Sequence, residues 1–368
     1  MLFSMNRNKI GILTFHSTLN YGAHLQAYAL CNYIRGLGFE CEIVDYRNDR
    51  ILASYDLRLS KNMSSPKTLL KYLLTVADMK RKKQALETFL RPYVSKETYV
   101  KDTIGKASES YHTIVVGSDQ IWNLELTGND KSYYLEFPVV KRVAYAASFG
   151  KKPTDIKEIS SIENELRVFD YIAVREADAV GYLRGLGIEK AIQTIDPTFL
   201  LTKEQWQRLI AKAKRYHQKK KYILVYAQGR PRLGFKFAEE VARRENLELI
   251  VIHSYAKKYP NALNIRDASI EEFLMLINDA EHVVTTSFHG MALSLILGKD
   301  LYYEEKSNLD NANSRLKSLA ELMHIENHKI EKSMPEKDML PINYEYVGKV
   351  IEREREKAKE FLLKAFKD

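Results

Sequence analysis

The order of apolar and polar residues predicts a chain in which short buried strands alternate with helices. The clearest case is the β-branched run His282–Thr286, which predicts a strand, followed by Met291–Leu297, which predicts a helix that ends at Gly298. His289 and Gly290 then lie at the turn between the strand and the helix. Such a turn presents backbone N–H groups and the positive end of a helix dipole, and anions bind there readily.

The imidazole at this turn has two interpretations. In the first, His289 is an electrostatic clamp or a proton donor for a bound anion, with Ser287 and Gly290 beside it. In the second, His289 is a satisfied polar residue at a helix start and Ser287 is only the helix cap.

The first elements of the chain predict a strand–helix–strand unit. Its parts are the strand Lys9–Thr14, the helix Ala23–Leu37 and the strand Glu40–Asp45. The dinucleotide fingerprint G-x-G-x-x-G is absent from the turn, so a nicotinamide cofactor is not expected.

The polar loop that follows the first strand is a candidate ligand-binding site. It contains His16, Asn20, Tyr21 and Gly22. Ligands of open α/β sheets bind beyond the carboxyl ends of the strands, which is where this loop lies. The alternative is a plain connection between strand and helix.

A second polar loop follows the predicted strand His112–Val116. It contains Asp119, Gln120, Trp122 and Asn123. Carboxylate and amide groups bind sugar hydroxyls, an indole face stacks on a sugar ring, and Asp119 could take the proton from an attacking hydroxyl. The alternative is an Asx-turn with a buried tryptophan.

The remaining chain continues the alternation of strands and helices and then repeats it. This pattern predicts two Rossmann-like α/β domains with parallel sheets and a ligand cleft between them. We expect an N-terminal domain at 1–200, a C-terminal domain at 201–343 and a helix at 344–368 that packs back on the body.

One predicted helix, Pro66–Arg81, combines leucines with a basic end, M-K-R-K-K. If exposed, it would bind anionic lipid headgroups or a lipid-linked substrate at the membrane surface. The alternative is a packed helix with solvated lysines.

The composition and charge of the chain exclude some classes of protein. The chain has 368 residues and a formal net charge of +9, spread through the helices instead of a tail. No nucleic-acid-binding motif occurs, so no nucleic-acid partner is expected. Cys31 and Cys41 are predicted to be free thiols, which suits the cytoplasm. No apolar run approaches the ~20 residues of a membrane span, and no ligand cluster requires a metal.

Several motifs in order along the chain carry a resemblance. They are T-F-H-S-T-L-N-Y-G-A-x-L-Q-A-Y-A-L, V-G-S-D-Q-I-W-N, Y-A-A-S-F-G, V-R-E, D-P-T, S-F-H-G and N-S-R. Together they resemble the polysaccharide pyruvyl transferase family over nearly the whole chain. The resemblance implies a GT-B-type fold and transfer of pyruvate from phosphoenolpyruvate to two hydroxyls of a sugar, which forms a cyclic ketal.

The resemblance also implies which parts of the chain act. The two polar loops of the N-terminal domain would bind the acceptor sugar, and the C-terminal domain would bind the donor. The key histidine of the family corresponds to His289. Some members carry an arginine two residues earlier to hold the donor, where this chain has Ser287. Another cation must then supply that contact. Arg315 is the first candidate, and Lys299, Arg175 and Arg230 follow.

Three functions remain open at this point. The first is a ketal pyruvyl transferase that uses phosphoenolpyruvate as co-substrate, needs no other cofactor, and acts on a sugar or a lipid-linked saccharide. The second is a GT-B glycosyltransferase that uses a nucleotide sugar. The third is a non-catalytic glycan-binding protein of the same fold.

Overall fold

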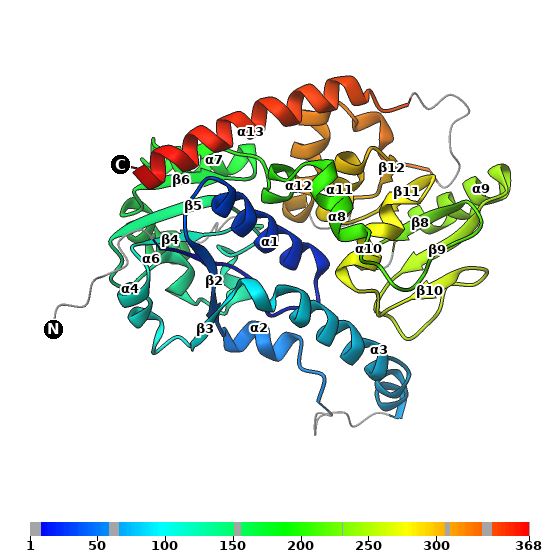
Figure 1. Ribbon diagram of the computed structural model, residues 1–368, viewed down its shortest axis with the longest axis horizontal. Helices are drawn as coiled ribbons and strands as arrows, with labels where there is room; N and C mark the ends of the chain where they lie inside the picture. Colours follow the sequence, from blue (N-terminus) through cyan, green and yellow to red (C-terminus); the bar gives the residue numbers. More distant parts are fainter. Residues whose placement is uncertain are drawn as a thin grey trace. The chain divides into compact units, whose positions relative to one another are not determined.

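The computed structural model describes residues 9–58, 66–150, 156–229, 231–305, 310–332 and 341–367. Its contacts divide the chain into two compact units, whose elements are labelled in Figure 1. Unit 1 comprises Met1–Tyr55, Leu90–Leu201 and Ile351–Asp368, and unit 2 comprises Asp56–Phe89 and Thr202–Val350. Among the described residues, each unit contains one sheet, and all paired strands run parallel.

The sheet of unit 1 has seven strands in the order β3-β2-β1-β4-β5-β6-β7. All residues of the central strands β1 and β4 are buried, as expected when helices cover both faces of a parallel sheet. Ile10 at the start of β1 aligns with Cys41 on one side and with Thr113 on the other. The strands are β1 (Ile10–Leu13), β2 (Cys41–Tyr46), β3 (Val94–Tyr99), β4 (Thr113–Val116), β5 (Lys141–Ala147), β6 (Tyr171–Val174) and β7 (Ile192–Gln193).

The helices of unit 1 connect these strands. The longest of them, α1, buries one face that includes Leu25, Leu30 and Ile34. The helices are α1 (Tyr21–Gly36), α2 (Asp49–Ser54), α4 (Ala107–Ser110), α5 (Leu124–Thr127), α6 (Ile156–Arg167) and α7 (Ala177–Gly185), with 3₁₀ turns at Arg91–Tyr93, Ile104–Lys106, Lys131–Tyr134 and Pro197–Leu200.

The sheet of unit 2 has five strands in the order β10-β9-β8-β11-β12. Every residue of the central strand β8 is buried, and so is every residue of α11 behind it. A helix that is apolar all round belongs to the interior of a domain. The strands are β8 (Tyr222–Tyr226), β9 (Glu248–Ile252), β10 (Leu263–Ile265), β11 (His282–Thr285) and β12 (Asp300–Tyr303).

Two of the helices of unit 2 start at well-defined caps. Ser269 with Glu272, and Thr202 with Gln205, form capping boxes that satisfy the first N–H groups of α10 and α8. The helices are α3 (Pro66–Leu90), α8 (Lys203–Ile210), α9 (Gly234–Glu245), α10 (Ile270–Asn278), α11 (Phe288–Leu297) and α12 (Asp310–Met323), with a 3₁₀ turn at Glu326–His328.

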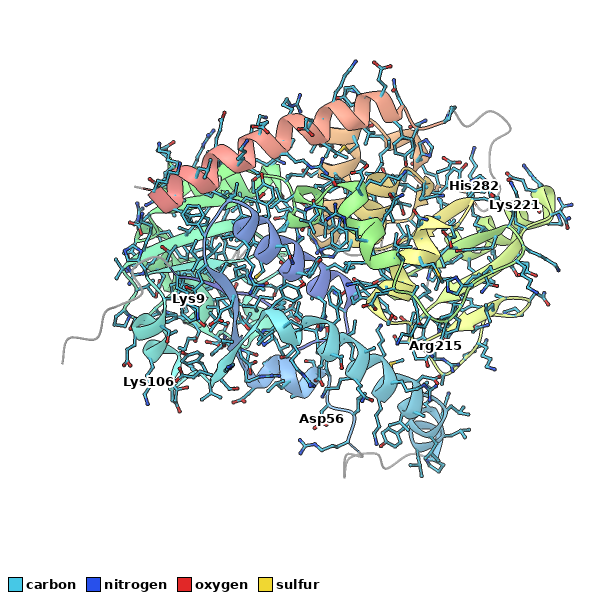
Figure 2. The ribbon with its side chains drawn as sticks, viewed as in Figure 1. Lys9, Asp56, Lys106, Arg215, Lys221 and His282 are labelled. Carbon is cyan, nitrogen blue, oxygen red and sulfur yellow. The ribbon has the colours of Figure 1, made fainter. Side chains whose placement is uncertain are left out.

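The division of the chain differs from the predicted one in two places. The change of unit after Leu201 lies next to the predicted boundary, but residues 56–89 group with unit 2 and residues 351–368 with unit 1. Ion pairs explain the first difference. Arg81 of α3 donates to Asp267 at 2.7 Å, and Arg215, labelled in Figure 2, donates to the same carboxylate at 3.0 Å. Partners 186 residues apart leave no local pattern in the sequence.

Helix α13 (Tyr344–Lys367) confirms the predicted packing of the C-terminal helix on the body. Its residues from Ile351 onward belong to unit 1. There Phe361 packs against Tyr145 and Tyr171, and Arg355 donates to the carbonyl oxygen of Phe199 at 2.6 Å. Among the described residues, no helix is both long and apolar enough to cross a membrane.

Candidate functional site

The predicted site residues gather where the strand order reverses. Ligands of open parallel sheets bind beyond the carboxyl ends of the strands at such a switch point. The order reverses between β1 and β4 in unit 1 and between β8 and β11 in unit 2. The loops after β1 and β4 contain His16 and Asp119, and His289 follows β11. The structure therefore brings the two predicted acceptor loops together at one sheet edge.

Hydrogen bonds join the two acceptor loops of unit 1. Thr14 Oγ1 donates to the carbonyl oxygen of Ser118 at 2.8 Å, and Gln26 Nε2 donates to Thr14 Oγ1 at 2.9 Å. All three residues are buried, so these bonds hold the loops in a fixed arrangement.

His16 has a different role from the predicted one. Its Nδ1 lies 3.2 Å from the carbonyl oxygen of Thr14, and its Nε2 lies 2.8 Å from Oδ1 of Asp45. Both ring nitrogens are therefore engaged by groups of the protein itself. Neither ring nitrogen is then left for a sugar hydroxyl, and His16 positions the loop instead. Its partner Asp45 was not predicted, because a single carboxylate at a strand end forms no motif.

The start of α1 accounts for the next three predicted residues. Asn20 is the N-cap, and its side-chain oxygen accepts the N–H of Gly22 at 3.0 Å. Tyr21 is 0% exposed. The structure therefore assigns Tyr21 to the core and Gly22 to the helix start, in place of direct acceptor contacts. Asn20 remains partly exposed at the sheet edge.

Asp119 lies on strained backbone at the carboxyl end of β4. Its φ is 77°, in the left-handed region that residues other than glycine rarely adopt, and Ala146 on the neighbouring β5 has a φ of 52°. Asp119 also forms a parallel bridge with Ala147, where the register of β5 shifts. Strain of this kind costs about 1–3 kcal/mol per residue and clusters at functional sites. The backbone therefore supports Asp119 as a site residue.

Trp122 belongs to the core. Its side chain is 0% exposed, and its Nε1 donates to the carbonyl oxygen of Tyr133 at 3.0 Å. Its ring stacks on Tyr134 and also contacts Phe149 and Phe169. A ring with no exposed surface cannot stack on a sugar, so the structure corrects the predicted role and supports the alternative of a buried tryptophan.

Gln120 and Asn123 form a linked pair beside Asp119. The N–H of Gln120 donates to Asp119 Oδ1 at 2.9 Å, and Asn123 Nδ2 donates to Gln120 Oε1 at 3.2 Å. Asn123 also caps α5, because its Oδ1 accepts the N–H of Leu126 at 3.1 Å. Gln120 is partly exposed and Asn123 is buried, so Gln120 is the more accessible candidate for a ligand contact.

Four of the sequence motifs meet in one buried network at the same edge of unit 1. Arg175 donates to Asp196 at 2.9 Å and to Ser118 Oγ at 3.3 Å, and it pairs with Glu176, which accepts from Ser148 at 2.7 Å. Burial would lower the pKa of Arg175, but the two carboxylates raise it. The structure thus makes Arg175, a reserve candidate for donor binding, part of a structural ion network in unit 1.

The turn before α11 in unit 2 confirms the capping interpretation of Ser287. Its Oγ accepts the N–H of Gly290 at 3.4 Å, a long contact. Thr285 Oγ1 accepts the N–H of Ser287 at 3.0 Å and donates to the carbonyl oxygen of Tyr226 at 2.7 Å. A Cβ at Gly290 would lie 2.4 Å from that Oγ1. Glycine therefore lets α11 approach β8 and β11 closely.

His289 is the second residue of α11. The helix begins at Phe288 instead of at the predicted Met291, so His289 lies within the first turn. An α-helix leaves its first N–H groups without intrahelical acceptors, and the positive end of its dipole lies there. Only 3% of His289 is exposed, so a ligand that reaches the ring must itself be largely buried.

Lys299 lies at the wrong end of α11 for the predicted role. The helix has 10 residues and is therefore about 15 Å long. Lys299 precedes β12, whereas His289 follows β11, so the two residues lie at opposite edges of a parallel sheet. Lys299 Nζ donates to the carbonyl oxygen of Asn278 at 2.7 Å, and burial lowers its pKa. This position is incompatible with a donor held at His289.

Arg315 remains a candidate for donor binding. It lies on α12, which follows β12 and packs beside α11. Helix α12 thus starts from the same sheet edge as α11, and Arg315 is partly buried there. Arg230, the last candidate, lies outside the described residues.

A carboxylate of the protein itself fills the N-terminus of α9. Glu304 is 5% exposed and follows β12. It accepts the N–H groups of Arg232, Leu233 and Gly234, with shortest distances of 2.8, 3.1 and 2.8 Å. This turn follows β8 and corresponds to the phosphate-binding turn of a Rossmann unit. This contact could not be predicted from the sequence, because Glu304 and the turn are about 70 residues apart.

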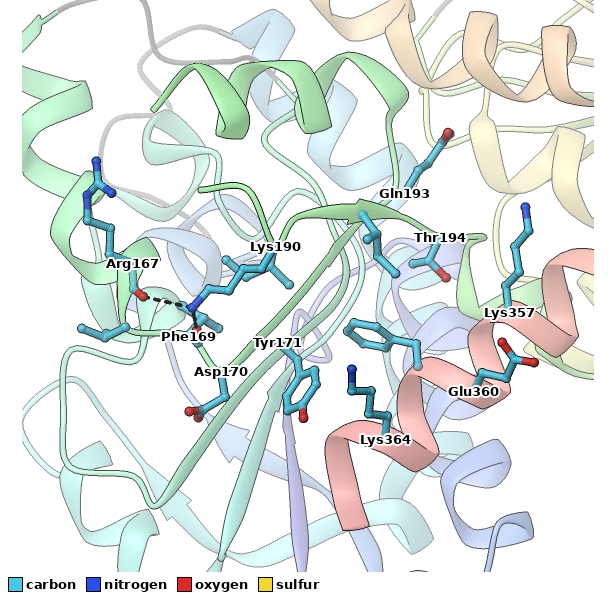
Figure 3. Close-up of a pocket in the computed structure, with 14 residues that line it drawn as sticks. Arg167, Phe169, Asp170, Tyr171, Lys190, Gln193, Thr194, Lys357, Glu360 and Lys364 are labelled. Atoms are coloured by element: carbon cyan, nitrogen blue, oxygen red, sulfur yellow. Dashed lines mark hydrogen bonds between the residues drawn. The ribbon is translucent and has the colours of Figure 1, made fainter. Parts of the chain in front are cut away.

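A pocket of about 1040 Å³ lies elsewhere in unit 1, between β6, β7 and α13 (Figure 3). Lys190 Nζ donates there to the carbonyl oxygens of Arg167 and Phe169. Cations and carboxylates both line the pocket, and none of the predicted site residues does. Within the described parts of the chain, no three His, Cys, Asp or Glu side chains are grouped to hold a metal ion.

A comparison with known protein families shows to which family the chain belongs. Residues 20–300 match the family described as polysaccharide pyruvyl transferase, which is well over half of the 368 residues. The chain belongs to the polysaccharide pyruvyl transferase family. The resemblance inferred from the motifs is therefore confirmed. No curated protein matches the sequence.

Solved structures share the fold of this family member. A structure from Listeria monocytogenes, provisionally named a UDP-N-acetylglucosamine 2-epimerase, aligns with a TM-score of 0.50 at 12% identity over 98% of this chain and 91% of that chain. The UDP-GlcNAc 2-epimerase from Methanocaldococcus jannaschii aligns with a TM-score of 0.47 at 14% identity over 94% and 92%. At 12% identity the likeness to the Listeria structure shows the fold alone, and together with the two parallel sheets it confirms the predicted GT-B-type α/β architecture.

The close approach at Gly290 predicts a specific loss of stability. Gly290→Ala should lower the free energy of unfolding by about 1–3 kcal/mol, because the new methyl group overlaps Thr285 Oγ1. Gly348→Ala is the matched control in α13 of the same unit, where a Cβ meets nothing within 4 Å. Gly348→Ala should raise the free energy of unfolding by about 0.5–1 kcal/mol. Urea unfolding measures both, and equal effects would contradict the described packing.

The pair of Asp45 and His16 predicts a pH-dependent stability. Burial alone would raise the pKa of Asp45, but hydrogen bonds from His16 and Thr98 lower it to about 2. A carboxylate with a lowered pKa stabilises the fold above its unfolded pKa of about 3.9, and this contribution disappears as the pH falls through about 2. Asp45→Asn should therefore destabilise by about 2 kcal/mol at pH 7 and by about half as much at pH 3.

Asp56, labelled in Figure 2, provides the control. Arg58 lowers its pKa to about 2 as well, but this pair lies at the surface, where water screens the charges. Asp56→Asn should leave the unfolding curve unchanged at both pH values. A destabilisation of Asp45→Asn that does not change with pH would contradict the account of the buried pair.

Proposed function

We propose that this protein transfers pyruvate from phosphoenolpyruvate to two hydroxyls of one sugar, a hexose such as galactose. The product is a cyclic ketal on a capsule, exopolysaccharide or cell-wall glycan precursor. The family match over residues 20–300 carries the proposal, and the position of His289 in the first turn of α11 supports it. Phosphoenolpyruvate is the co-substrate, and the scheme requires no other cofactor.

Unit 2 would hold the donor. Phosphoenolpyruvate carries a phosphate and a carboxylate, and the N–H groups at a helix N-terminus suit either anion. In this scheme the first turn of α11 binds the phosphate beside His289. Arg315 on the neighbouring α12 supplies a guanidinium for the second anionic group, in place of the arginine that this chain lacks at Ser287.

Unit 1 would hold the acceptor. Asp119, Gln120 and Asn20 lie on the two loops at the switch point of its sheet. The amides of Gln120 and Asn20 suit hydrogen bonds to sugar hydroxyls. Asp119 is the candidate base, because its carboxylate is held at the strand end by the N–H of Gln120.

The reaction then proceeds in two additions at C2 of the donor. A proton adds to the methylene carbon, and the first hydroxyl bonds to C2 while Asp119 takes its proton. The bond from C2 to the phosphate oxygen then breaks, inorganic phosphate leaves, and the second hydroxyl bonds to C2 and loses its proton. The two protons lost by the hydroxyls equal the two gained, one by the methylene carbon and one by the phosphate. His289 gives a proton to the departing phosphate, a type of assistance that is typically worth ~10²–10⁴-fold in rate.

The second candidate function is glycosyl transfer from a nucleotide sugar, which the GT-B architecture also permits. The diphosphate of a nucleotide sugar at the turn between β8 and α9 would meet Glu304. The carboxylate of Glu304 already accepts the N–H groups at the start of α9. Two anions would then compete for the same donors. This contact favours the pyruvyl donor over the nucleotide donor.

The place of action belongs to the same proposal. We propose that this enzyme is cytoplasmic and that it works at the inner face of the membrane when its acceptor is lipid-linked.

An assay with phosphoenolpyruvate and pooled galactosides or mannosides tests the function. The wild type should release inorganic phosphate and add the mass of a pyruvyl ketal to one acceptor. His289→Ala should lower kcat by ~10²–10⁴-fold. Arg315→Ala should raise KM for the donor by about 10–100-fold, because it removes a charge-assisted contact, with a smaller effect on KM for the acceptor.

Lys299→Ala is the matched control, since it removes a cation at the other end of α11. It should leave KM for phosphoenolpyruvate unchanged. Near-normal turnover by His289→Ala would exclude this histidine from the mechanism. Release of a nucleoside diphosphate from a nucleotide sugar would support the second candidate, and glycan binding without turnover would support the non-catalytic one.

A further inference from the structure

Helix α3, labelled in Figure 1, belongs to unit 2 up to Phe89. It has a buried apolar face along one half and an exposed apolar face along the other. In the C-terminal half, Met79, Leu86 and Leu90 are buried. In the N-terminal half the leucines are open to solvent, with exposed fractions of 40% for Leu69, 57% for Leu70, 60% for Leu73 and 54% for Leu74. We call these four residues the leucine face.

The leucine face points away from the side on which the helix packs. Successive residues of an α-helix turn by about 100°, so the four leucines occupy an arc of roughly 140°. The buried residues Met79, Leu86 and Leu90 lie on the opposite side, in an arc of about 40°. The exposed leucines are therefore not the continuation of the packed stripe, and the core of unit 2 does not explain them.

The charges beside the leucine face are positive. Lys67 and Lys71 are exposed in the same turns, and residues 66–77 contain no acidic residue. Lys80 is exposed and Lys83 is partly exposed further along the helix, and both add positive charge. The acid in this part of the helix, Asp78, is paired with Arg266 at 3.0 Å and with Arg81 at 2.5 Å.

Ion pairs orient the helix on unit 2. Asp78 accepts from Arg266, and Arg81 donates to Asp267 at 2.7 Å. Burial alone would raise the pKa of Asp267, but hydrogen bonds from Tyr216, Arg81 and Arg215 lower it to about 2. The carboxylate therefore stays ionised under ordinary conditions, and the leucine face is held outward by fixed contacts.

We propose that the leucine face of α3 binds the surface of a bilayer that contains anionic phospholipids. Leucines flanked by lysines suit the boundary between headgroups and acyl chains, where apolar side chains insert and cations pair with lipid phosphates. The absence of acidic residues beside the leucines makes the complementary surface negative, which favours such a bilayer over a neutral partner. This inference goes beyond the transfer reaction, because lipid binding is measured without either substrate.

Vesicle sedimentation with the full chain tests the proposal. The protein should bind vesicles of phosphatidylcholine with phosphatidylglycerol at least about tenfold more tightly than vesicles of phosphatidylcholine alone, and high salt should weaken this binding. The double variant Leu70→Glu, Leu73→Glu should lose about tenfold or more of the binding, because it places two charges on the inserted face.

A second double variant controls for the added charge. Gln84→Glu with Thr88→Glu adds the same two charges at exposed positions further along α3 and should keep most of the binding. Activity on a soluble sugar should be unchanged in both double variants, so failure of the membrane proposal would be distinct from failure of the proposed function. Equal vesicle binding by the leucine variant and the wild type would overturn the proposal. A second result would also overturn it: the wild type associates with itself and does not bind vesicles, and the leucine variant abolishes this self-association. A second copy of the chain would then be the partner of the leucine face.

Discussion

The common direction of all strands within each sheet is the constraint on which the candidate site depends. Because the strands are parallel, every strand ends at the same edge of its sheet, and the polar loops after them converge there. The order reverses once in each unit, beside β1 and beside β8, which opens one place for a ligand at each edge. His289 in unit 2 and Asp119 in unit 1 both lie at such a place. Lys299 does not, because it precedes its strand.

Within unit 2, the two helix N-termini next to the switch point differ in what they bind. The start of α9 is occupied by the carboxylate of Glu304, which belongs to the chain itself. The start of α11 is capped by the hydroxyl of Ser287 through one long contact and carries His289. The helix dipole favours an anion at each of these two N-termini. The internal carboxylate therefore directs an external anion toward α11, which is the physical basis of the proposed donor site.

Much of this could be predicted from the sequence. The alternation of buried runs and amphipathic helices identified the two parallel sheets, and the motifs identified the family. Two edge strands, β3 and β10, were missed. In β3 only Ser95 and Tyr99 are buried, so the apolar pattern is weak. The roles of individual residues were harder to predict. Tyr21 and Trp122 are residue types that are common in sugar-binding sites, but here they lie in the core. In the network around Arg175, residues of the sequence motifs form buried ion pairs and hydrogen bonds that stabilise the fold. Burial and long-range pairing decide these roles, and neither leaves a local signal.

A crystal structure with phosphoenolpyruvate bound would test the central claim most directly. The account predicts a phosphate or carboxylate oxygen of the donor within about 3 Å of a backbone nitrogen in the first turn of α11, with His289 in contact and Glu304 still on the N–H groups of α9. A donor bound at α9 in place of the Glu304 carboxylate, or on unit 1 away from His289, would contradict it.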